Sequence, residues 1–533
     1  MFARIKNQRN KDGSVRQYLE IVENRRVDGK VRQRVLANLG RLDRAQEGQI
    51  DALIGSLAKF SIRRALFDAA PDALSAQWSR DYGPVLVFRR LWEDLGLNGT
   101  LAKLLEGSKI QHDVEEATFA MVLNRLMDPE SKLGVSRWVD KVFRPEFESL
   151  GPQHFYRSLD VLARNKRLVE EALFARVRSL FDLELDVVFY DTTSTYVHGT
   201  QARLAEFGYS RDKRPDLRQV TVGILMTRDG MPVGHQVFPG NFADVECFLA
   251  ALADLRCRYK LGRVVMVADR GMVSKTTLAA LDNDGYQYIV GARMRRLKGA
   301  QRALAEPGPY QRVNDRLAVR ESVSGDRRYI VCYNPRQEQY DRQTREQTVA
   351  KLREKLAAGT VTGLVGNSGY RRYLRLSDTK GTIDEAKVES EALYDGKYVL
   401  MTNTDLPAAE VALAYKDLWQ VERAFRDLKS NLDLRPIYHW TTRRIHGHIM
   451  VCFLAYALEK LLVRRLKESH PELEYPQVRA DLDQLKMLKL SVNGRGYLLR
   501  TELQGNAYAL FRAVGSCPPP RVTELEPPKS AQM

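Results

Sequence analysis

Cysteine is scarce in this sequence, and its few cysteines are not paired. The five cysteines lie far apart and form no CxxC motif; they are Cys247, Cys257, Cys332, Cys452 and Cys517. This spacing argues against a disulfide framework and against a zinc site. We therefore expect buried, reduced thiols.

Long hydrophobic runs are also missing. No stretch approaches the ~18 uninterrupted apolar residues of a membrane span. The nearest case, residues 449–462, is interrupted by Glu459 and Lys460 and is predicted to be a buried helix. The polar start MFARIKNQRN has no apolar core of the kind that a signal peptide needs. We expect a soluble intracellular protein.

Acidic side chains are too few to balance the basic ones. The chain of 533 residues has 84 Lys and Arg against 67 Asp and Glu, a formal net charge of +17. This excess favours a polyanionic partner, either nucleic acid or an acidic membrane surface. With 44% hydrophobic and 28% charged residues, disorder is excluded as the main state. The length predicts about two to four domains.

The basic excess is concentrated at the N-terminus. Residues 1–44 hold twelve Lys or Arg against five Asp or Glu, and two alternating runs, 17–22 and 31–37, flank a turn at 28–29. This pattern predicts a β-hairpin. Arg32 and Arg34 share one face of the second run, where they could bind phosphates; a solvated edge hairpin is the alternative.

Helical periodicity follows, and then strands. Apolar residues recur at i, i+3, i+4 from 84 to 181, which indicates helices that form either a DNA-reading domain or a packing module. From Asp186 we predict an α/β unit. Its expected strands are 187–190, 219–226, 231–238, 264–268 and 286–290, and its expected helices are 245–260 and 276–284.

Residues 293–395 differ from this α/β pattern and are interpreted as an insertion. Strands are expected at 317–322, 329–333 and 370–375, with one charged helix at 342–356. The α/β pattern resumes with a strand at 397–402 and a long helix from Ala408, and the proline-rich tail after Cys517 is expected to be disordered. The predicted domains are 1–80, 81–183, 184–292, 293–395, 396–516 and 517–533.

Two predicted strands each end in an aspartate. Asp191 follows 187–190 and Asp269 follows 264–268, at the sheet edge where α/β proteins place their sites. One such aspartate alone is usually a turn former or a helix cap. Two neighbouring carboxylates repel each other unless a cation lies between them, and with no His or Cys cluster the expected cation is Mg²⁺ or Mn²⁺.

A third carboxylate lies on the helix YKDLWQVERAFRDLKSNLDLR. Tyr415, Glu422 and Lys429 are seven residues apart and would project along one stripe of a continuous helix. Apolar packing beside this stripe is expected from Trp419, Phe425 and Leu428. In the alternative interpretation, Glu422 only pairs with Arg426 on a wet surface.

These residues resemble the DDE triad of insertion-sequence transposases of the IS4 type, most closely the IS1634 group. The triad stands in VVFYDTTSTYVHG, VVMVADRGMVS and YKDLWQVERAFRDLK. Tyr415, Glu422 and Lys429 match the family signature Tyr-(2)-Arg-(3)-Glu-(6)-Lys, but Leu418 stands at the arginine position. Further similar blocks follow in the same order, among them NKDGSV, GYSRDKRPDLRQVTVG, FPGNFADV and LRPIYHWTTRRIHGHI.

The resemblance implies a fold, a chemistry and partners. The fold would be an RNase H-like α/β core interrupted by a β-rich insertion and preceded by the basic hairpin and the helical region. Two Mg²⁺ ions, or Mn²⁺, would be held by Asp191, Asp269 and Glu422, with Asp191 bridging both. Expected DNA contacts are Tyr415, Lys429, Arg270, Arg426, Trp419, Arg32 and Arg34.

The implied activity is cleavage at the inverted repeats of an insertion sequence and transfer of the 3′ ends to target DNA. A homodimer in the prokaryotic cytoplasm, at the nucleoid, is expected to carry it out. The alternatives are a stand-alone metal-dependent nuclease with an RNase H-like core and a non-catalytic DNA-binding relic of a transposase. The loop 211–218 is expected near the active site, either contacting DNA or ordering with the metal, or only solvated at the surface.

Overall fold

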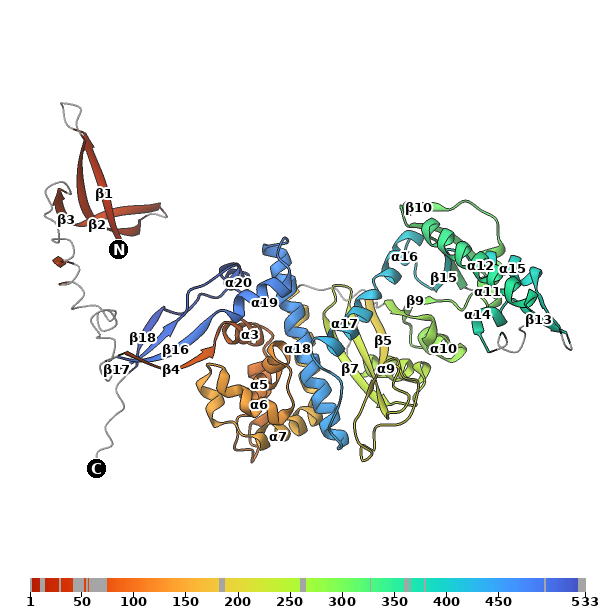
Figure 1. The fold of residues 1–533 in the computed structure, drawn as a ribbon, viewed down its shortest axis with the longest axis horizontal. Helices are drawn as coiled ribbons and strands as arrows, with labels where there is room; N and C mark the ends of the chain where they lie inside the picture. Colours follow the sequence, from red (N-terminus) through yellow and green to blue (C-terminus); the bar gives the residue numbers. More distant parts are fainter. Residues whose placement is uncertain are drawn as a thin grey trace. The chain divides into compact units, whose positions relative to one another are not determined.

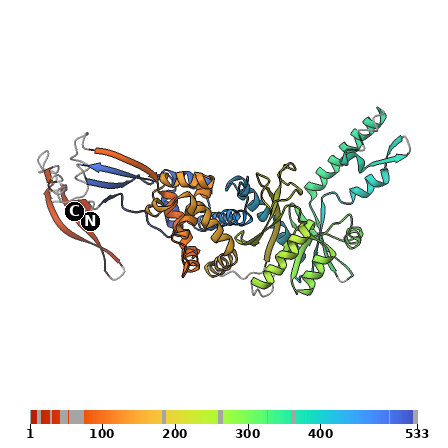
Figure 2. The ribbon, with the colours of Figure 1, turned by 90° about the horizontal axis from the view of Figure 1, so that it is seen from below.

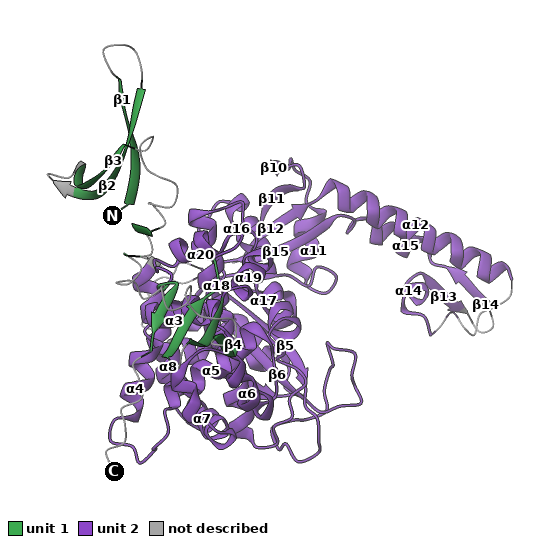
Figure 3. Cartoon of the chain, turned by 60° about the vertical axis from the view of Figure 1, so that its left-hand side comes forward, with its two compact units in different colours: residues 1–79, 486–502, 519–533 green, residues 80–485, 503–518 purple. Residues whose placement is uncertain are grey.

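The chain divides into two compact units in a computed structural model. Residues 2–9, 15–27, 30–41, 52–53, 56, 74–181, 187–258, 265–325, 327–358, 364, 366–377, 380–492 and 495–525 are described. Unit 1 consists of 1–79, 486–502 and 519–533, and unit 2 of 80–485 and 503–518 (Figure 3). In these described ranges no helix has both the length and the apolar character to cross a membrane.

Unit 1 contains a three-stranded antiparallel sheet at the N-terminus. Strands β1 (Phe2–Arg9), β2 (Val15–Val27) and β3 (Lys30–Arg41) follow in the order β1-β2-β3 (Figure 1). The predicted hairpin is confirmed as β2 and β3, while its turn lies outside the described residues. Strand β1 was not predicted; Arg4 joins it to β2 through a 2.9 Å ion pair with the buried Glu20.

A four-stranded sheet combines three strands from the C-terminal part of the chain with one strand from its N-terminal part. Strands β4 (Leu74–Asp81), β16 (Lys486–Val492), β17 (Arg495–Arg500) and β18 (Val522–Glu524) are ordered β18-β17-β16-β4. Leu490, Val492 and Tyr497 form its small core. The expectation of a disordered tail is wrong for β18, which pairs with β17; residues 526–533 lie outside the described residues.

Helices of unit 2 pack around one long central helix, α18 (Thr442–Ser469). Helix α18 is apolar on nearly every side from Ile449 to Leu462, so it is buried as predicted rather than amphipathic. It packs against α5 and α7 (Figure 1). The helices of this body are α3 (Gly83–Asp94), α4 (Leu97–Leu105), α5 (Val114–Met127), α6 (Lys132–Trp138), α7 (Pro152–Arg164), α8 (Lys166–Phe181), α19 (Tyr475–Asp483) and α20 (Ala507–Ala513). The described residues thus confirm a helical region at 84–181, whose helices share a core with α18.

A nine-stranded mixed sheet forms the other part of unit 2 (Figures 1 and 2). Its order is β10-β11-β12-β15-β9-β8-β5-β6-β7. Strands β5, β6 and β7 form an antiparallel meander, while β8 and β9 run parallel to β5, the arrangement expected of an RNase H-like core. The bounds are β5 (Val187–Tyr196), β6 (Gln219–Thr227), β7 (Pro232–Pro239), β8 (Val265–Ala268), β9 (Gln287–Gly291), β10 (Gln311–Asn314), β11 (Leu317–Ser324), β12 (Arg327–Tyr333) and β15 (Lys397–Thr402).

Both faces of this sheet are covered, which fixes the orientation of each strand residue. Val187 and Phe189 belong to the core shared with the helices around α18, and Val188 and Tyr190 belong to the opposite core. The opposite core also takes residues from α9 (Asp244–Arg258), α10 (Lys275–Asn283) and α11 (Lys298–Ala305). Because side chains alternate along a strand, a run that is apolar at every position is buried on both sides.

The insertion is less rich in strands than predicted. Strands β10–β12 extend the central sheet through β15, and the remainder is mostly helical: α12 (Pro335–Ala357), α14 (Ser368–Arg371) and α15 (Glu385–Ala392), with one hairpin of β13 (Leu374–Ser377) and β14 (Lys380–Ile383) (Figure 3). The strand expected from Tyr370 is wrong at its start, because Asn367 caps a helical turn there. Helix α12 begins earlier than predicted, at Pro335, after the cap Asn334.

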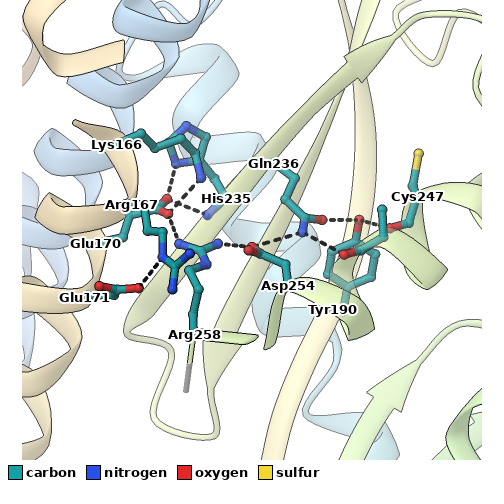
Figure 4. Close-up of polar contacts among 11 residues, drawn as sticks. Lys166, Arg167, Glu170, Glu171, Tyr190, His235, Gln236, Cys247, Asp254 and Arg258 are labelled. Atoms are coloured by element: carbon teal, nitrogen blue, oxygen red, sulfur yellow. Dashed lines mark hydrogen bonds and ion pairs between the residues drawn. The ribbon is translucent and has the colours of Figure 1, made fainter. Parts of the chain in front are cut away.

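A buried charged cluster joins α8 to the central sheet (Figure 4). Glu170, on α8, is fully buried and pairs with Lys166, Arg258 and His235. Its Oε1 atom lies 2.7 Å from Nδ1 of His235 and also accepts a hydrogen bond from the backbone N–H of His235 on β7. Burial alone would raise the pKa of Glu170, but these partners hold it well below its usual value. The cluster therefore contains an ionised carboxylate whose removal would take a buried anionic partner from both Lys166 and Arg258.

Candidate active site

Asp191 and Asp269 lie at the same level on adjacent parallel strands. Tyr190 on β5 is the register partner of Ala268 on β8, and each aspartate is the next residue of its strand or loop. The prediction that β5 ends at Asp191 is wrong, because the strand continues to Tyr196 through its pairing with β6. Asp269 does follow the end of β8, as expected.

Burial and nearby acidic side chains both act on the pKa of Asp191. Removal from solvent raises the pKa of Asp191 to about 7, and the negative charges of Asp269 and Asp244 add to this rise. Arg211 and the backbone N–H of Thr192 act in the opposite direction. The ionised form of Asp191 is thus unfavourable here unless positive charge is supplied.

Asp244 is a third acidic residue near this pair, and the sequence analysis did not single it out. Its Oδ1 accepts a 2.7 Å hydrogen bond from Thr192 Oγ1, and both its oxygens lie 3.1 Å from Nη2 of Arg211. The strand order indicates why Asp244 lies here. Strands β5 and β7 are both antiparallel to β6, so β7 runs parallel to β5 and its carboxyl end lies at the same edge of the sheet as that of β5. Asp244 begins α9, just after the end of β7.

Tyr415 is held against the second aspartate. Its hydroxyl donates a 3.0 Å hydrogen bond to Oδ1 of Asp269. Burial, with the charge of Asp269 adding, raises the pKa of Tyr415 well above its usual value, so the phenol stays protonated and remains a donor. Gly291 leaves room for this contact, since a Cβ there would lie 2.6 Å from the Tyr415 hydroxyl and 3.1 Å from the Arg270 backbone nitrogen.

Gly291→Ala is expected to destabilise the protein by about 1–3 kcal/mol, because the added methyl group overlaps the Tyr415 hydroxyl. The free energy of unfolding measures this cost. Tyr415→Phe removes the overlapping oxygen, so the same Gly291→Ala change should cost less in that background. An equal cost in both backgrounds would show that the two side chains do not compete for this space.

The helix expected to carry Tyr415, Glu422 and Lys429 on one stripe is interrupted. Helix α16 (Ala408–Lys416) bears Tyr415, and α17 (Trp419–Ser430) bears the other two. Between them, i→i−3 hydrogen bonds such as Leu418 N to Tyr415 O tighten the turn. A tightened turn changes the angular spacing, so a seven-residue repeat no longer places Tyr415 on the stripe of α17.

Glu422 is exposed on α17, which packs against β5. Within the described ranges it makes no hydrogen bond or ion pair, so the alternative pairing with Arg426 is not formed. In the same ranges, no group of three or more His, Cys, Asp or Glu residues is close enough together to hold a metal ion. Asp191 and Asp269 thus lie at one level of the sheet, and among the described residues no side-chain hydrogen bond or ion pair joins Glu422 to its neighbours.

Lys429 and Arg435 share one carboxylate. Oδ1 of Asp212 lies 2.9 Å from Nζ of Lys429 and 2.7 Å from Nη1 of Arg435. Burial lowers the pKa of Lys429, and the hydrogen bond with Asp212 opposes this change. Asp212 follows Arg211, so the loop 208–218 contacts both the acidic residues and the basic residues of the site.

The other residues expected to bind DNA lie on α17, just after β8, and on β3 of unit 1. On α17, Arg426 and Trp419 are exposed, with 51% of Trp419 accessible, so the expected packing by Trp419 is wrong while Phe425 and Leu428 are buried. Leu418 is buried in the core, where it offers no phosphate contact. Arg270, exposed, follows Asp269; Arg32 and Arg34 are exposed on β3 of unit 1.

Two family profiles match parts of this chain. The profile of the "IS1634 family transposase, N-terminal domain" matches residues 3–71, and that of the "Transposase DDE domain" matches residues 182–458. No curated protein matches the chain. Among solved structures, the cryo-EM structure of the piggyBac transposase synaptic complex with hairpin DNA is similar, with a TM-score of 0.38, 9% identity, and coverage of 75% of this chain and 79% of that chain. Since the DDE domain alone spans more than half of the sequence, the chain belongs to the DDE transposases, and its N-terminal segment is similar to the N-terminal domain of the IS1634 family.

Proposed function

We propose that this transposase binds the terminal inverted repeats of its insertion sequence, cleaves the DNA at the element ends and joins the freed 3′ ends to target DNA. The observation that carries the proposal is the pairing of Asp191 and Asp269 at one level of two parallel strands. Family membership gives the class of reaction, and this geometry indicates where in the chain the reaction would occur.

DDE transposases use divalent metal ions, and the donor set here suits them. Carboxylate oxygens are the ligands that Mg²⁺ and Mn²⁺ prefer. Burial, with the charges of Asp269 and Asp244 adding, raises the pKa of Asp191, so a bound cation would favour its ionised form. Two such ions would activate the attacking oxygen and neutralise the leaving oxygen of the phosphodiester. Asp191, Asp269 and Glu422 would hold these ions.

The side chains around the metal ligands would orient them and the DNA. Tyr415 donates its hydroxyl hydrogen to Asp269, which would fix the direction in which that carboxylate presents its other oxygen. Glu422 has no competing partner in the described part of the chain, so it is available to approach the aspartate pair once metal and DNA are bound. Lys429, Arg270, Arg426 and Trp419 would contact DNA near the cut.

Two DNA ends must be held together for coordinated transfer, and we propose that a homodimer holds them. The similar piggyBac structure is described as a synaptic complex with hairpin DNA. We further propose that the exposed arginines Arg32 and Arg34 lie along DNA phosphates, because a cationic ribbon neutralises the backbone without reading its sequence.

The experiment is cleavage of a duplex that carries the element's own end and its flank, in Mg²⁺. The matched control duplex has the same length and composition with its terminal repeat scrambled. Cutting at the repeat boundary in the first duplex alone is the expected result. Equal cutting of both duplexes would favour a nuclease without end specificity, and binding without any cutting would favour a DNA-binding relic.

A further inference from the structure

The carboxylate of Asp212 lies between two basic side chains, Lys429 and Arg435, beside the candidate active site. Its side chain is only 6% exposed, and a single oxygen, Oδ1, is shared by Lys429 Nζ and Arg435 Nη1. The other oxygen of Asp212, Oδ2, is buried and has no hydrogen-bond partner among the described residues. The side chain of Lys429 is also largely buried, with 10% exposed. A buried carboxylate with one unsatisfied oxygen costs free energy, so this arrangement is poorer than a fully paired one.

The neighbouring residues hold Asp212 in place without relieving this cost. Arg211 donates its backbone N–H to Ser194 Oγ on β5 and places its guanidinium on Asp244. Lys213 has a φ of +56°, in the left-handed region that costs a residue with a Cβ about 1–2 kcal/mol. The contacts of Arg211 and Asp212 thus maintain a strained loop.

The two cations that hold Asp212 have the chemistry of a phosphate site. An ammonium and a guanidinium can both donate to one anionic oxygen, and Arg435 lies over the ring of Tyr196 with 5.9 Å between its Cζ and the ring centroid. This contact places the guanidinium beside an aromatic ring. Partial burial of both cations strengthens their attraction for an anion. Asp212 binds both cations through a single oxygen, Oδ1, whereas a DNA phosphate could offer a separate oxygen to each cation.

We propose that Lys429 and Arg435 form a binding site for one phosphate of the DNA backbone and that Asp212 fills this site in the free protein. The inference rests on the proposed function. Entry of the phosphate displaces Asp212, and with it the loop 208–218. Because Arg211 is the adjacent residue, the same movement withdraws its guanidinium from Asp244 and exposes the acidic residues. DNA binding and opening of the acidic site are thus coupled.

Asp212→Asn tests the proposal in the full-length chain, with a 30-base-pair duplex and EDTA to isolate binding from cleavage. Loss of the negative charge should leave Lys429 and Arg435 free for phosphate, so DNA affinity should rise about three- to tenfold. The matched control is Asp216→Asn in the same loop; Asp216 pairs with Arg214 at the surface, where the two side chains are 58% and 43% exposed, and its loss should change affinity less than twofold.

Unchanged or weaker binding by Asp212→Asn would overturn the inference. Failure of the wild-type chain to bind any duplex would instead overturn the proposed function. Hydrogen exchange in the wild type gives a second test that needs no variant: DNA should speed exchange of the amides in 208–218, and slower exchange there would contradict displacement of the loop. Arg435→Gln should lower DNA affinity and reduce the gain from Asp212→Asn.

Discussion

Asp191→Asn is expected to lower the rate of DNA cleavage at least about a thousandfold and to raise the melting temperature of the metal-free protein by about 1–3 °C. The rate falls because a proposed ligand of the metal ions loses its charge. Stability rises because the raised pKa of Asp191, about 7, means that folding opposes its ionisation. Native proteins often retain such costs at functional sites.

The sign of the pH dependence follows from the same shift. The pKa of Asp191 is higher in the folded chain than its ordinary value of 3.8, so its ionisation removes stability as the pH rises from about 4 to 7. Melting curves of the metal-free wild type and Asp191→Asn should therefore diverge across this range and be furthest apart above pH 7.

Asp229→Asn is a suitable control for Asp191→Asn, because Asp229 is an exposed turn residue that pairs with Arg464. It should change neither the cleavage rate nor the melting temperature appreciably. Cleavage by Asp191→Asn within tenfold of the wild-type rate would contradict the role of Asp191. A lower melting temperature would contradict the electrostatic account of its burial.

Glu170→Gln is expected to destabilise the chain by about 3–5 kcal/mol, the usual cost of removing one partner from a buried charged cluster. The amide keeps the size of the carboxylate but leaves Lys166 and Arg258 without their shared anion, and Arg258 is only 2% exposed. The cluster joins α8 to β7, so the loss falls between the helices and the central sheet (Figure 4).

The adjacent Glu171→Gln is the matched control for Glu170→Gln. Glu171 pairs with Arg167 at the surface, where the two side chains are 31% and 63% exposed, and its loss should cost less than about 1 kcal/mol. Urea denaturation of both variants measures the difference. Equal losses would show that burial of Glu170 contributes nothing beyond an ordinary surface pair.

Much of the sheet could be predicted because its strands are fully apolar and bounded by turn residues. The strand expected at 397–402 has the bounds of β15, and Asp269 lies just after β8 as expected. Asp191 and Asp269 lie at one level of the sheet, although β5 continues past Asp191: the polar run TTST is typical of a strand end by composition but is buried by pairing with β6.

Other features depend on contacts that no local pattern contains. The break between α16 and α17 has no proline or glycine to mark it; Leu418, at the break, is drawn into the core. Asp212 and Arg435 are far apart in the sequence, so their ion pair depends on how the loop folds back. Helix α12 was expected at 342–356 from its charged sequence, but its first turns and the short helices α14 and α15 were not predicted, because these segments are mostly polar and have no clear apolar stripe.

The most direct test of the proposed metal centre counts the Mn²⁺ ions bound to the chain in complex with an uncleaved element end. Electron paramagnetic resonance gives the number per active site. Two ions are predicted for the wild type and for the control Arg426→Gln, and at most one for Glu422→Gln, because Glu422 is a proposed ligand of the metal centre and its amide would bind a divalent ion less well. Two ions in Glu422→Gln would contradict a three-carboxylate centre.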